Sequence, residues 1–462
     1  MPGPAAAVAR RLDRLDARAA RWIVAVLAAV PFALSIPAPL PPHGYGHVLW
    51  GAALLAWLRH PAERVRYLLY AAAIVLQTLA FPDIDFGWLG WVLLVPYLAA
   101  RERDDGAAWW RAAFLFGFFR AFAGYTWLGN VHYTGWLAVA TLSVVAVAID
   151  HESAVRFARF PAEARRVSTA WALFEWVHSW IGGGLPWLYL AHSQYAFLPV
   201  VQAADLVGAA GLSFLMAYAQ AAGFGAARAR RFGVEAAVAA LLVAAALAYG
   251  FTRSFPAAGP DAPAVLMVQS AFPHGVKEDP ATAGLSEFDL WDRLRDLTKA
   301  GLADHPDTDL VVWPETMHPY LYVEDSPEIS EDFATSLRVV AWQTGLPVIY
   351  GANTFTDASR LARGHNSAVL AAPIDRARPP DPGDDLVRGI YRKQSLVPMG
   401  EEFLPRRFLP EAWCDRAFAW LMRNLGYPAT CDLEAGEGFA VLDAGPGLRW
   451  AALLCFEGLW PG

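Results

Sequence analysis

Cysteine and lysine are both scarce in this chain of 462 residues. The three cysteines exclude a disulfide-rich scaffold and a zinc site built from cysteine ligands. Lysine is equally rare, because almost all of the 37 basic residues are arginine. Each retained lysine therefore indicates a position that favours a compact ammonium over a guanidinium. The three lysines are Lys277, Lys299 and Lys393.

Charge is also sparse for a soluble protein. Charged residues make up 18% of the chain and hydrophobic residues 56%, with a mean hydropathy of +0.29. This composition is typical of a membrane protein with a water-soluble part. The twenty tryptophans agree, because indole rings favour the membrane–water interface. A formal net charge of −7 gives no reason to expect nucleic acid as a partner. His43 and His47 have ligand-like spacing, but the glycines around them disfavour a helix, and no metal site is expected.

The first half of the chain alternates apolar runs with arginine clusters, up to a change of composition near residues 253–256. Basic clusters at every second loop mark one side as cytoplasmic, which predicts a cytoplasmic N-terminus and an extracytoplasmic second half. The candidate membrane crossings are 22–40, 44–58, 67–82, 86–100, 109–129, 134–150, 168–183, 200–224 and 234–252.

The second half has mixed polar sequence in which strand and helix patterns alternate. Apolar runs predict strands, and apolar residues at helical spacing predict the helices between them. This order is typical of an α/β domain. The predicted strands are 265–269, 310–312, 348–350, 367–370 and 451–454, and the predicted helices are 284–303 and 326–345.

Three residues at or near predicted strand ends form a candidate catalytic set: Glu315, Lys393 and Cys455. A free thiol is mostly protonated at neutral pH, so a nucleophilic cysteine needs a base within reach. A carboxylate whose pKa is raised by burial can take the proton, and an ammonium stabilises the thiolate and the oxyanion that follows.

Each of these residues also has a structural interpretation. A cysteine after an apolar strand is more often a small buried hydrophobe, and a Trp-Pro-Glu segment is more often a turn. A lysine is usually a solvated surface charge. Their order and local context together favour the catalytic interpretation.

Three motifs carry a family resemblance: Trp-Pro-Glu at 313–315, Tyr-x-Lys-x-x-Leu-Val-Pro-x-Gly-Glu at 391–401, and Cys-Phe-Glu at 455–457. In this order they resemble the nitrilase (carbon–nitrogen hydrolase) superfamily and, within it, the apolipoprotein N-acyltransferases. The segments 81–88 and 185–194 resemble loops of the same family. The resemblance runs from about residue 67 to the end of the chain.

The resemblance implies a polytopic α-helical membrane domain followed by an α/β nitrilase-like domain, an αββα sandwich. Residues 1–66 would form a basic segment with an extra apolar hairpin, residues 67–255 the membrane domain, and residues 263–462 the catalytic domain. The implied location is the inner membrane of a bacterium, with the catalytic domain in the periplasm.

The implied activity is acyl transfer without a cofactor. An acyl chain would pass from a phospholipid, typically phosphatidylethanolamine, to Cys455 as a thioester. It would then pass to the α-amine of S-diacylglyceryl-cysteine in an apolipoprotein, with ping-pong kinetics. Glu315 would be the general base and Lys393 the oxyanion stabiliser. Further active-site positions that match the family are Glu401, Phe456 and Glu457. Both substrates remain in the lipid bilayer, which explains the membrane half.

Some positions depart from the family. Glu278 stands where the family has a tryptophan, and Met399 stands where it has a phenylalanine. The family also continues well past the cysteine, so we expect the chain to be truncated at its C-terminus and inactive on its own. Two alternatives are a membrane-tethered amidase that hydrolyses a soluble amide, and an inactive truncated pseudoenzyme.

Two weaker patterns remain. Glu175 and His178 lie one helical turn apart in an apolar run, where a buried polar pair that locks helices is favoured over a functional site. Cys414 and Cys431 lie in the predicted periplasmic domain, where a disulfide between them is a hypothesis.

Overall fold

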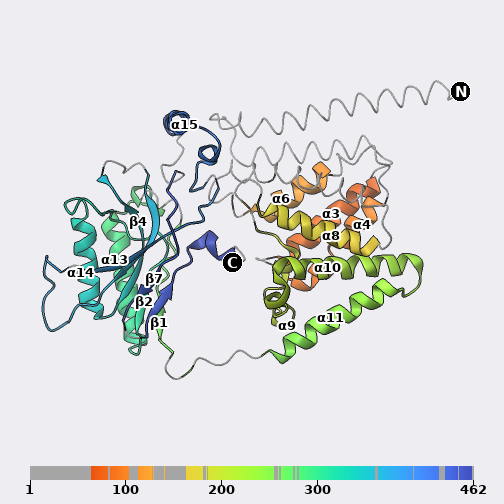
Figure 1. Cartoon of the computed structure of the whole chain (residues 1–462), viewed down its shortest axis with the longest axis horizontal. Helices are drawn as coiled ribbons and strands as arrows, with labels where there is room; N and C mark the ends of the chain where they lie inside the picture. The colour runs from red at the N-terminus through yellow and green to blue at the C-terminus, as the bar shows by residue number, and fades with distance from the viewer. Residues whose placement is uncertain are drawn as a thin grey trace. The chain divides into compact units, whose positions relative to one another are not determined.

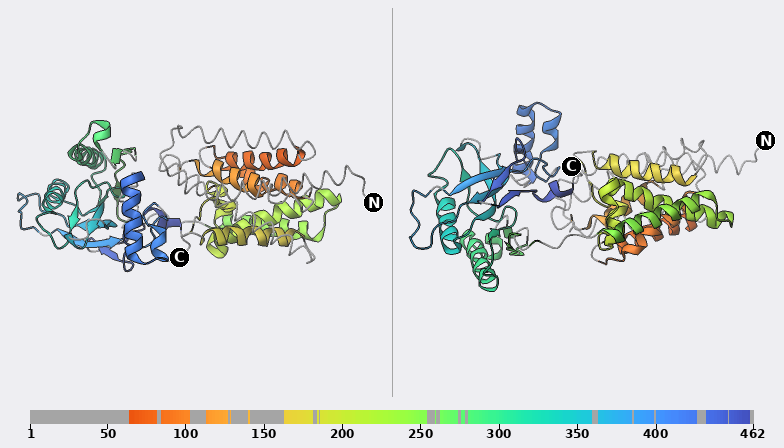
Figure 2. Two further views of the ribbon diagram at one scale, coloured as in Figure 1. Left: turned by 90° about the horizontal axis from the view of Figure 1, so that it is seen from above. Right: turned by 60° about the horizontal axis from the view of Figure 1, so that its bottom comes forward.

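The computed structural model divides the chain into two compact units, Met1–Phe255 and Pro256–Gly462, which are described separately. Figure 1 shows both units, and Figure 2 shows them in two further views. The structure describes residues 64–459 apart from 82–83, 103–112, 127, 129–139, 141–162, 181–183, 185, 254–258, 260–261, 274–275, 278–279, 359–362, 385, 399, 426–431 and 446.

The first unit is helical in its described part. Helix α10 (Ala204–Ala229) is central: it packs against α8 (Glu163–His178), α4 (Leu94–Arg101) and α11 (Val234–Thr252). The core between these helices is rich in aromatic rings, with Tyr97 stacked on Phe116 at a centroid separation of 4.6 Å. The remaining elements are α3 (Arg64–Ala80), η2 (Gly87–Trp91), η3 (Ala113–Phe118), α6 (Phe119–Gly124), η7 (Leu190–Gln194) and α9 (Leu198–Val201).

Two helices in the described part of the chain are long and apolar enough to cross a membrane, α10 and α11. The predicted crossing at 234–252 coincides with α11, and the one at 200–224 overlaps α9 and α10. The predicted crossings at 67–82 and 168–183 correspond to the shorter helices α3 and α8. Those at 22–40 and 44–58 lie outside the described residues, as does nearly all of 134–150. The two candidate spans alone therefore do not confirm a polytopic domain.

Two other predicted crossings differ from the structure. The range 109–129 contains the short helices η3 and α6, and 86–100 contains η2 and α4 in place of one helix. Close packing explains why residues 86–100 form η2 and α4 instead of one helix. A Cβ on Gly87 would lie 2.2 Å from the Ser193 carbonyl oxygen, and Gln194 Nε2 donates to the Gly87 carbonyl at 2.6 Å. These contacts hold η2 against η7.

Glu175 is buried on α8, where its Oε1 accepts hydrogen bonds from Trp171 Nε1 and the Leu190 N–H, both at 2.7 Å. The second bond joins α8 to η7. Glu175 thus links α8 to η7 through a backbone N–H, whereas the sequence favoured a polar pair of Glu175 with His178. His178 stacks on Phe174 at a centroid separation of 5.9 Å.

The second unit contains a mixed six-stranded sheet in the order β1-β2-β4-β5-β6, with β3 paired to β4. Strands β1, β2, β3 and β4 pair in parallel, whereas β4–β5 and β5–β6 are antiparallel. The strands are β1 (Val265–Met267), β2 (Leu310–Val312), β3 (Tyr322–Val323), β4 (Val348–Phe355), β5 (His365–Ala371) and β6 (Val387–Arg392).

Both faces of this sheet are covered. On one face, Val348, Tyr350 and Val369 pack with helices α13 (Glu287–Asp304) and α14 (Glu331–Thr344). On the other face, Ile349 and Leu370 pack with a two-stranded sheet, β7 (Val441–Asp443) and β8 (Arg449–Ala451). Alternate residues of each strand point to opposite faces, which explains this division. The described residues thus form a helix layer, a sheet and a second sheet (Figure 1).

Local sequence fixes the helix ends. Helix α13 begins at a capping box in which Ser286 Oγ accepts from the Asp289 N–H at 3.2 Å and Asp289 Oδ2 accepts from the Ser286 N–H at 2.7 Å. Helix α14 ends at Gly345, whose φ of 64° suits a glycine.

Helix α15 (Glu411–Leu425) carries Cys414, which is a free thiol buried against Phe403 and Phe418. The hypothetical disulfide to Cys431 is therefore not formed by Cys414 in this structure. Cys431 itself lies outside the described residues.

The predicted strands and helices of this unit recur with shifted ends. The difference that matters for function is at 451–454, where β8 ends at Ala451 and the chain turns. The Leu454 N–H donates to Glu457 Oε2 at 2.8 Å instead of joining a strand. Strand β6 was not predicted, because Arg388, Gly389 and Arg392 interrupt its apolar pattern.

Replacing Leu337 with alanine should destabilise the second unit. Leu337 is 1% exposed between α14 and the sheet, and cavities at such sites cost about 2–5 kcal/mol. Hydrogen–deuterium exchange of the full-length protein should show faster exchange in peptides from α14 and β4. Leu321→Ala is the control, because Leu321 is 42% exposed. Equal exchange in both variants would contradict this packing.

Candidate functional site

The ends of three strands meet at one edge of the large sheet. Strands β2, β4 and β6 run in the same direction, so their carboxyl ends lie at the same edge, and β5 begins there. Glu315 follows β2, and Lys393 follows β6 directly. Asn366 lies near the start of β5 and pairs with Asn353 of β4. The sheet topology therefore brings together side chains that are far apart in the sequence.

Lys393 is at the centre of this group. Its side chain is fully buried, and its Nζ lies 3.1 Å from Glu315 Oε1 and 2.9 Å from the Glu401 carboxylate. Burial lowers the pKa of the ammonium, but the two carboxylates outweigh burial and raise it above its ordinary value. Lys393 therefore carries a permanent positive charge inside the protein.

Asn366 also holds the two carboxylates of Glu315 and Glu401 in place. Its Nδ2 donates to Glu315 Oε1 at 2.6 Å and to Glu401 Oε1 at 2.8 Å. Glu401 Oε2 also accepts from the Val397 N–H at 2.9 Å. The sequence did not identify Asn366, because a single asparagine in an apolar strand belongs to none of the three motifs.

Glu315 is a charged carboxylate in this arrangement. Burial raises its pKa, but Lys393, the Asn366 hydrogen bond and Lys277 together lower the pKa below the ordinary value. The sequence argument required burial to raise it, and the nearby cations reverse that direction. Lys277 Nζ donates to the Glu315 carbonyl oxygen at 2.9 Å, so two of the three lysines of the chain contact this residue.

Gly351 makes room for the turn that carries Glu315. A Cβ at this position of β4 would lie 2.1 Å from the Pro314 carbonyl oxygen and 2.6 Å from Glu315 Cα. Only glycine permits such a close backbone approach. The next residue, Thr316, has a φ of 48°, so the turn is also strained.

Cys455 lies on a sharp turn after β8, at the start of the short helix η12 (Cys455–Leu459). Its φ is 47°, which is uncommon for a residue other than glycine. Strained strand-to-helix turns of this kind expose a nucleophile in several hydrolases. Cys455 is exposed, whereas the following residues, Phe456 and Glu457, are buried.

Glu457 ties this turn to the segment that carries Lys393. Its Oε1 accepts from Tyr391 Oη at 2.8 Å and from the Gln394 N–H at 2.7 Å. Its Oε2 accepts from the Leu454 N–H at 2.8 Å. Tyr391 and Gln394 lie on either side of Lys393, within two residues, so Glu457 fixes the position of Cys455 relative to the ammonium. Glu457 is a positioning residue.

The thiol of Cys455 is held in its protonated form at rest. Although Cys455 is exposed as a whole residue, the protein atoms around its thiol displace water, and this desolvation raises the thiol pKa most. The charges of Glu315 and Glu401 raise the pKa further, while Lys393 lowers it. A side-chain hydrogen bond with Glu315 also raises the thiol pKa. The Cys455 thiol is therefore within reach of Glu315 and interacts electrostatically with Lys393.

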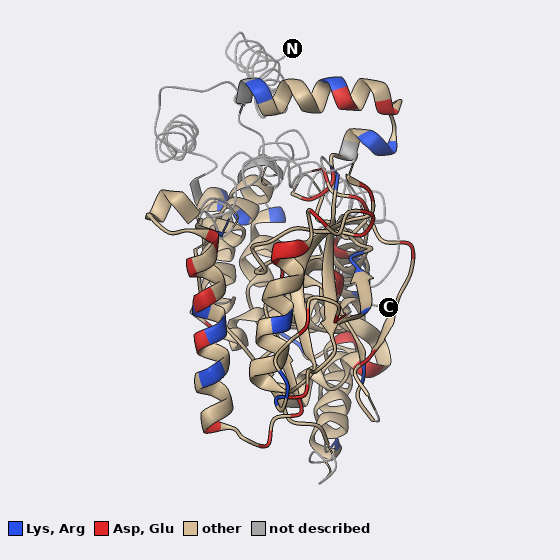
Figure 3. Ribbon diagram, turned by 90° about the vertical axis from the view of Figure 1, so that its left-hand side faces the viewer, with Lys and Arg blue, Asp and Glu red and all other residues tan. Residues whose placement is uncertain are grey.

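The structure thus brings four predicted residues together: Glu315, Lys393, Glu401 and Cys455. Phe456 and Glu457 lie behind the cysteine and support its turn. Charged residues elsewhere in this unit lie mainly on helices and loops, with both signs interspersed (Figure 3). Within the described residues, no group of three or more histidine, cysteine or acidic side chains could hold a metal ion.

Comparison with known proteins supports the family resemblance. A family model for the apolipoprotein N-acyltransferase N-terminal domain matches residues 73–222. The apolipoprotein N-acyltransferase of Geobacter metallireducens is 29% identical over 418 residues, which cover 86% of this chain and 73% of that protein. That of Methylococcus capsulatus is 27% identical over 451 residues, which cover 94% of this chain and 74% of that protein.

Among solved structures, a carbon–nitrogen hydrolase from Helicobacter pylori matches 39% of this chain and 47% of its own, with 19% identity and a TM-score of 0.23. The resemblance to apolipoprotein N-acyltransferases that the motifs indicate is confirmed by the family model and the curated relatives.

The pKa of Cys455 should respond in opposite directions to its two charged neighbours. Glu315→Gln removes a negative charge and a hydrogen bond, so the thiol pKa should fall and alkylation by iodoacetamide should become faster at neutral pH. Lys393→Met removes a positive charge, so the pKa should rise and alkylation should slow. Peptide mass spectrometry across a pH series separates Cys455 from the other two cysteines. Shifts in the same direction in both variants would contradict the site geometry.

Gly351→Ala should displace Glu315 from the thiol. The new Cβ would overlap the Pro314–Glu315 backbone, so the alkylation profile of Cys455 should move in the direction of Glu315→Gln. Gly438→Ala is the matched control, because a Cβ there meets no atom within 4 Å. If both alanine variants keep the original profile, Gly351 does not position Glu315.

Proposed function

We propose that the protein carrying this sequence, which is related to the apolipoprotein N-acyltransferases along most of its length, transfers an acyl chain from a phospholipid to the N-terminal amine of a diacylglyceryl-apolipoprotein. The observation that carries the proposal is the convergence of Glu315, Lys393, Glu401 and Cys455 at one sheet edge. A nucleophile, a base and a fixed cation are the groups that acyl transfer through a thioester needs.

In the first half-reaction, Cys455 Sγ attacks the ester carbonyl carbon of the phospholipid, and its proton passes to Glu315. The carbonyl oxygen gains negative charge, which the Lys393 ammonium stabilises. The carbon–oxygen bond to glycerol then breaks, Glu315 returns the proton to the leaving alkoxide, and a lysophospholipid departs. The acyl chain remains on Cys455 as a thioester.

In the second half-reaction, the α-amine of the lipoprotein's modified cysteine attacks the thioester carbonyl. Glu315 takes a proton from the amine, the carbon–sulfur bond breaks, and the departing thiolate regains a proton from Glu315. The product is an amide, and the enzyme returns to its starting state. Lys393 faces the same developing oxyanion in both halves.

The charges of the resting site favour proton transfer during attack rather than before it. The Cys455 pKa is raised and the Glu315 pKa is lowered, so a thiolate beside a protonated Glu315 is unfavourable at rest. Negative charge moves from sulfur to the carbonyl oxygen as the new bond forms. The charge then lies where Lys393 stabilises it, which is a stabilisation specific to the transition state.

The membrane position of the helical unit supports a lipid substrate. Helices α10 and α11 are candidate spans, with Arg228 in the last turn of α10 and Arg230 and Arg231 in the turn between them. Basic residues near this turn favour the cytoplasmic side, which supports the proposal that the end of α11 and the second unit lie on the periplasmic side of an inner membrane. Phosphatidylethanolamine is the proposed donor.

The test uses full-length protein and phosphatidylethanolamine with an isotope-labelled acyl chain. A hydroxylamine-labile label on the Cys455 peptide is expected, followed by transfer to a synthetic diacylglyceryl-cysteine peptide. Lys393→Met should slow thioester formation about 10²–10³-fold, the usual loss when an oxyanion partner is removed. Glu315→Gln should slow it about 10²–10⁴-fold.

Cys414→Ala is the matched cysteine control, because the Cys414 thiol is buried on α15. This substitution should leave the rate of thioester formation unchanged. Label that forms equally in a Cys455→Ala variant would reject the proposed nucleophile. Hydrolysis of a soluble amide with no thioester from phospholipid would favour the membrane-tethered amidase instead.

A further inference from the structure

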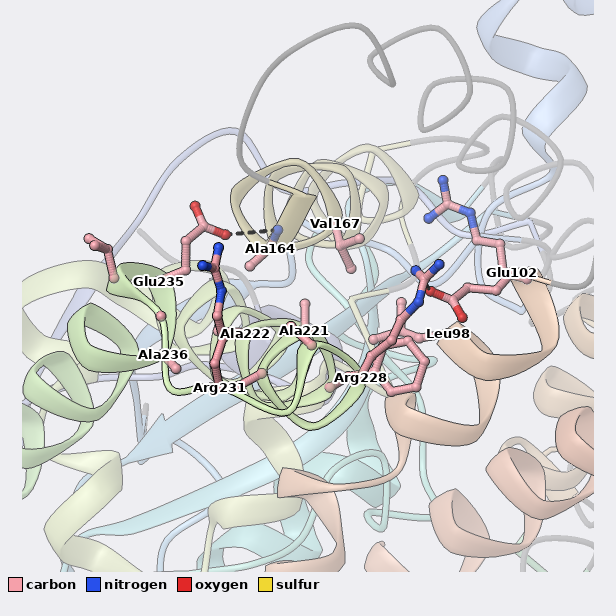
Figure 4. Close-up of a pocket in the computed structure, with 17 residues that line it drawn as sticks. Leu98, Glu102, Ala164, Val167, Ala221, Ala222, Arg228, Arg231, Glu235 and Ala236 are labelled. Atoms are coloured by element: carbon pink, nitrogen blue, oxygen red, sulfur yellow. Dashed lines mark hydrogen bonds and ion pairs between the residues drawn. The ribbon is translucent and has the colours of Figure 1, made fainter.

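The helical unit contains a second feature that acyl transfer does not use. A cavity of about 770 Å³ lies between the carboxyl ends of α4 and α10 and the amino ends of α8 and α11 (Figure 4). Its walls are formed largely by small and apolar side chains. Among the residues that line it are Leu98, Ala164, Val167, Ala221, Ala222 and Phe224.

Charged side chains surround the same cavity. Three arginines line it, Arg101, Arg228 and Arg231, together with Glu102 and Glu235. Figure 4 shows Arg228 beside Glu102 at one side, with Arg231 at the other. The cavity therefore combines an apolar wall with charged groups.

Both carboxylates already have partners. Glu102 pairs with Arg228, and Glu235 pairs with Arg165 at 3.0 Å and accepts from the Ala164 N–H at 3.1 Å. Arg101 and Arg231 form no ion pair with another residue in the part of the chain that the structure describes. The lining therefore has an excess of positive charge, which a ligand with negative charge would neutralise.

The surface next to the cavity is apolar and exposed. Val234, which lines the cavity at the start of α11, is 81% exposed, and Leu241, two turns further along, is 68% exposed. Only 17% of the most apolar stretch of α11 is buried within the protein. An amphiphile could therefore place its head among the arginines and its chains along α11.

The location separates this cavity from the proposed donor site. It lies at the first residues of α11, whereas the last residues of α11 lead to the second unit. The 19 residues of α11 rise about 28 Å, close to the thickness of the hydrocarbon core. If α11 crosses the bilayer, a lipid in this cavity belongs to the leaflet in which α11 begins.

We propose that this cavity binds the headgroup of an anionic phospholipid between Arg101 and Arg231, with its acyl chains against α10 and α11. Two arginines with no carboxylate partner among the described residues favour a lipid with net negative charge over a zwitterionic one. This inference rests on the proposed membrane position of α10 and α11, and it is independent of acyl transfer at Cys455.

The experiment measures lipid binding to the full-length protein by native mass spectrometry from detergent micelles. Phosphatidylglycerol, phosphatidylcholine and inorganic phosphate are titrated separately. The wild-type protein should retain one phosphatidylglycerol more tightly than phosphatidylcholine. The double variant Arg101→Gln/Arg231→Gln should bind it about thirtyfold more weakly, roughly fivefold for each guanidinium.

Arg253→Gln is the matched control. Arg253 follows the other end of α11 and pairs with Asp205 at 3.1 Å, so its loss tests general charge attraction without touching the cavity. Ala221→Phe is a second variant that keeps every arginine but fills the wall, and it should also weaken phosphatidylglycerol binding. The double variant Arg101→Lys/Arg231→Lys should retain most of the binding, which separates charge loss from misfolding.

Three results would overturn the proposal: equal phosphatidylglycerol binding by the double glutamine variant and by Arg253→Gln, equal retention of phosphatidylcholine, or displacement of the lipid by inorganic phosphate at similar concentrations. The last result would identify a free-anion site. Thioester formation on Cys455, measured on the same samples, reports the proposed function separately.

Discussion

The buried ammonium of Lys393 is the constraint on which the candidate site of the second unit depends. A charge removed from water is tolerated only when opposite charges and hydrogen bonds replace the solvent, and Glu315 and Glu401 supply them at 3.1 and 2.9 Å. Each carboxylate comes from a different part of the sheet edge, so the ion cluster joins the segments after β2 and β6. Without the ammonium, two carboxylates that share one Asn366 donor would repel each other. The same cation that stabilises the fold at this edge is therefore the group available to an oxyanion.

The site is ordered before any substrate arrives. Gly351 admits the turn of Glu315, and Glu457 fixes the turn of Cys455 against the segment that bears Lys393. The positive φ angles of Thr316 and Cys455 are strained conformations that the surrounding hydrogen bonds maintain. The electrostatic balance keeps the thiol protonated at rest, which protects it from unwanted reactions. In the reaction that we propose, the carbonyl oxygen of a lipid substrate receives the charge that sulfur alone would hold poorly.

The sequence predicted the residues that motifs carry, and it missed those that only the third dimension brings together. Glu315, Lys393, Glu401 and Cys455 stand in recognisable local patterns, whereas Asn366 and Gly351 lie in apolar strands with no distinguishing neighbours. Most strands followed from apolar runs, but β3, β6 and β7 did not. In β6, the arginines hide the alternation. In the helical unit, hydrophobicity located α11 closely. It could not predict that residues 86–100 divide into η2 and α4, because that break depends on contacts with η7 more than a hundred residues away.

The titration of Lys393 tests most directly whether its ammonium lies between the carboxylates of Glu315 and Glu401. Because the chain has three lysines, ¹³C-labelled lysine gives a simple NMR spectrum that Lys→Arg variants assign. We expect the Lys393 signal to titrate above the ordinary lysine pKa of about 10.4. We also expect Glu401→Gln to lower the pKa of Lys393. A Lys393 signal that titrates at or below the ordinary value, unchanged by Glu401→Gln, would show that the ammonium does not lie between the two carboxylates.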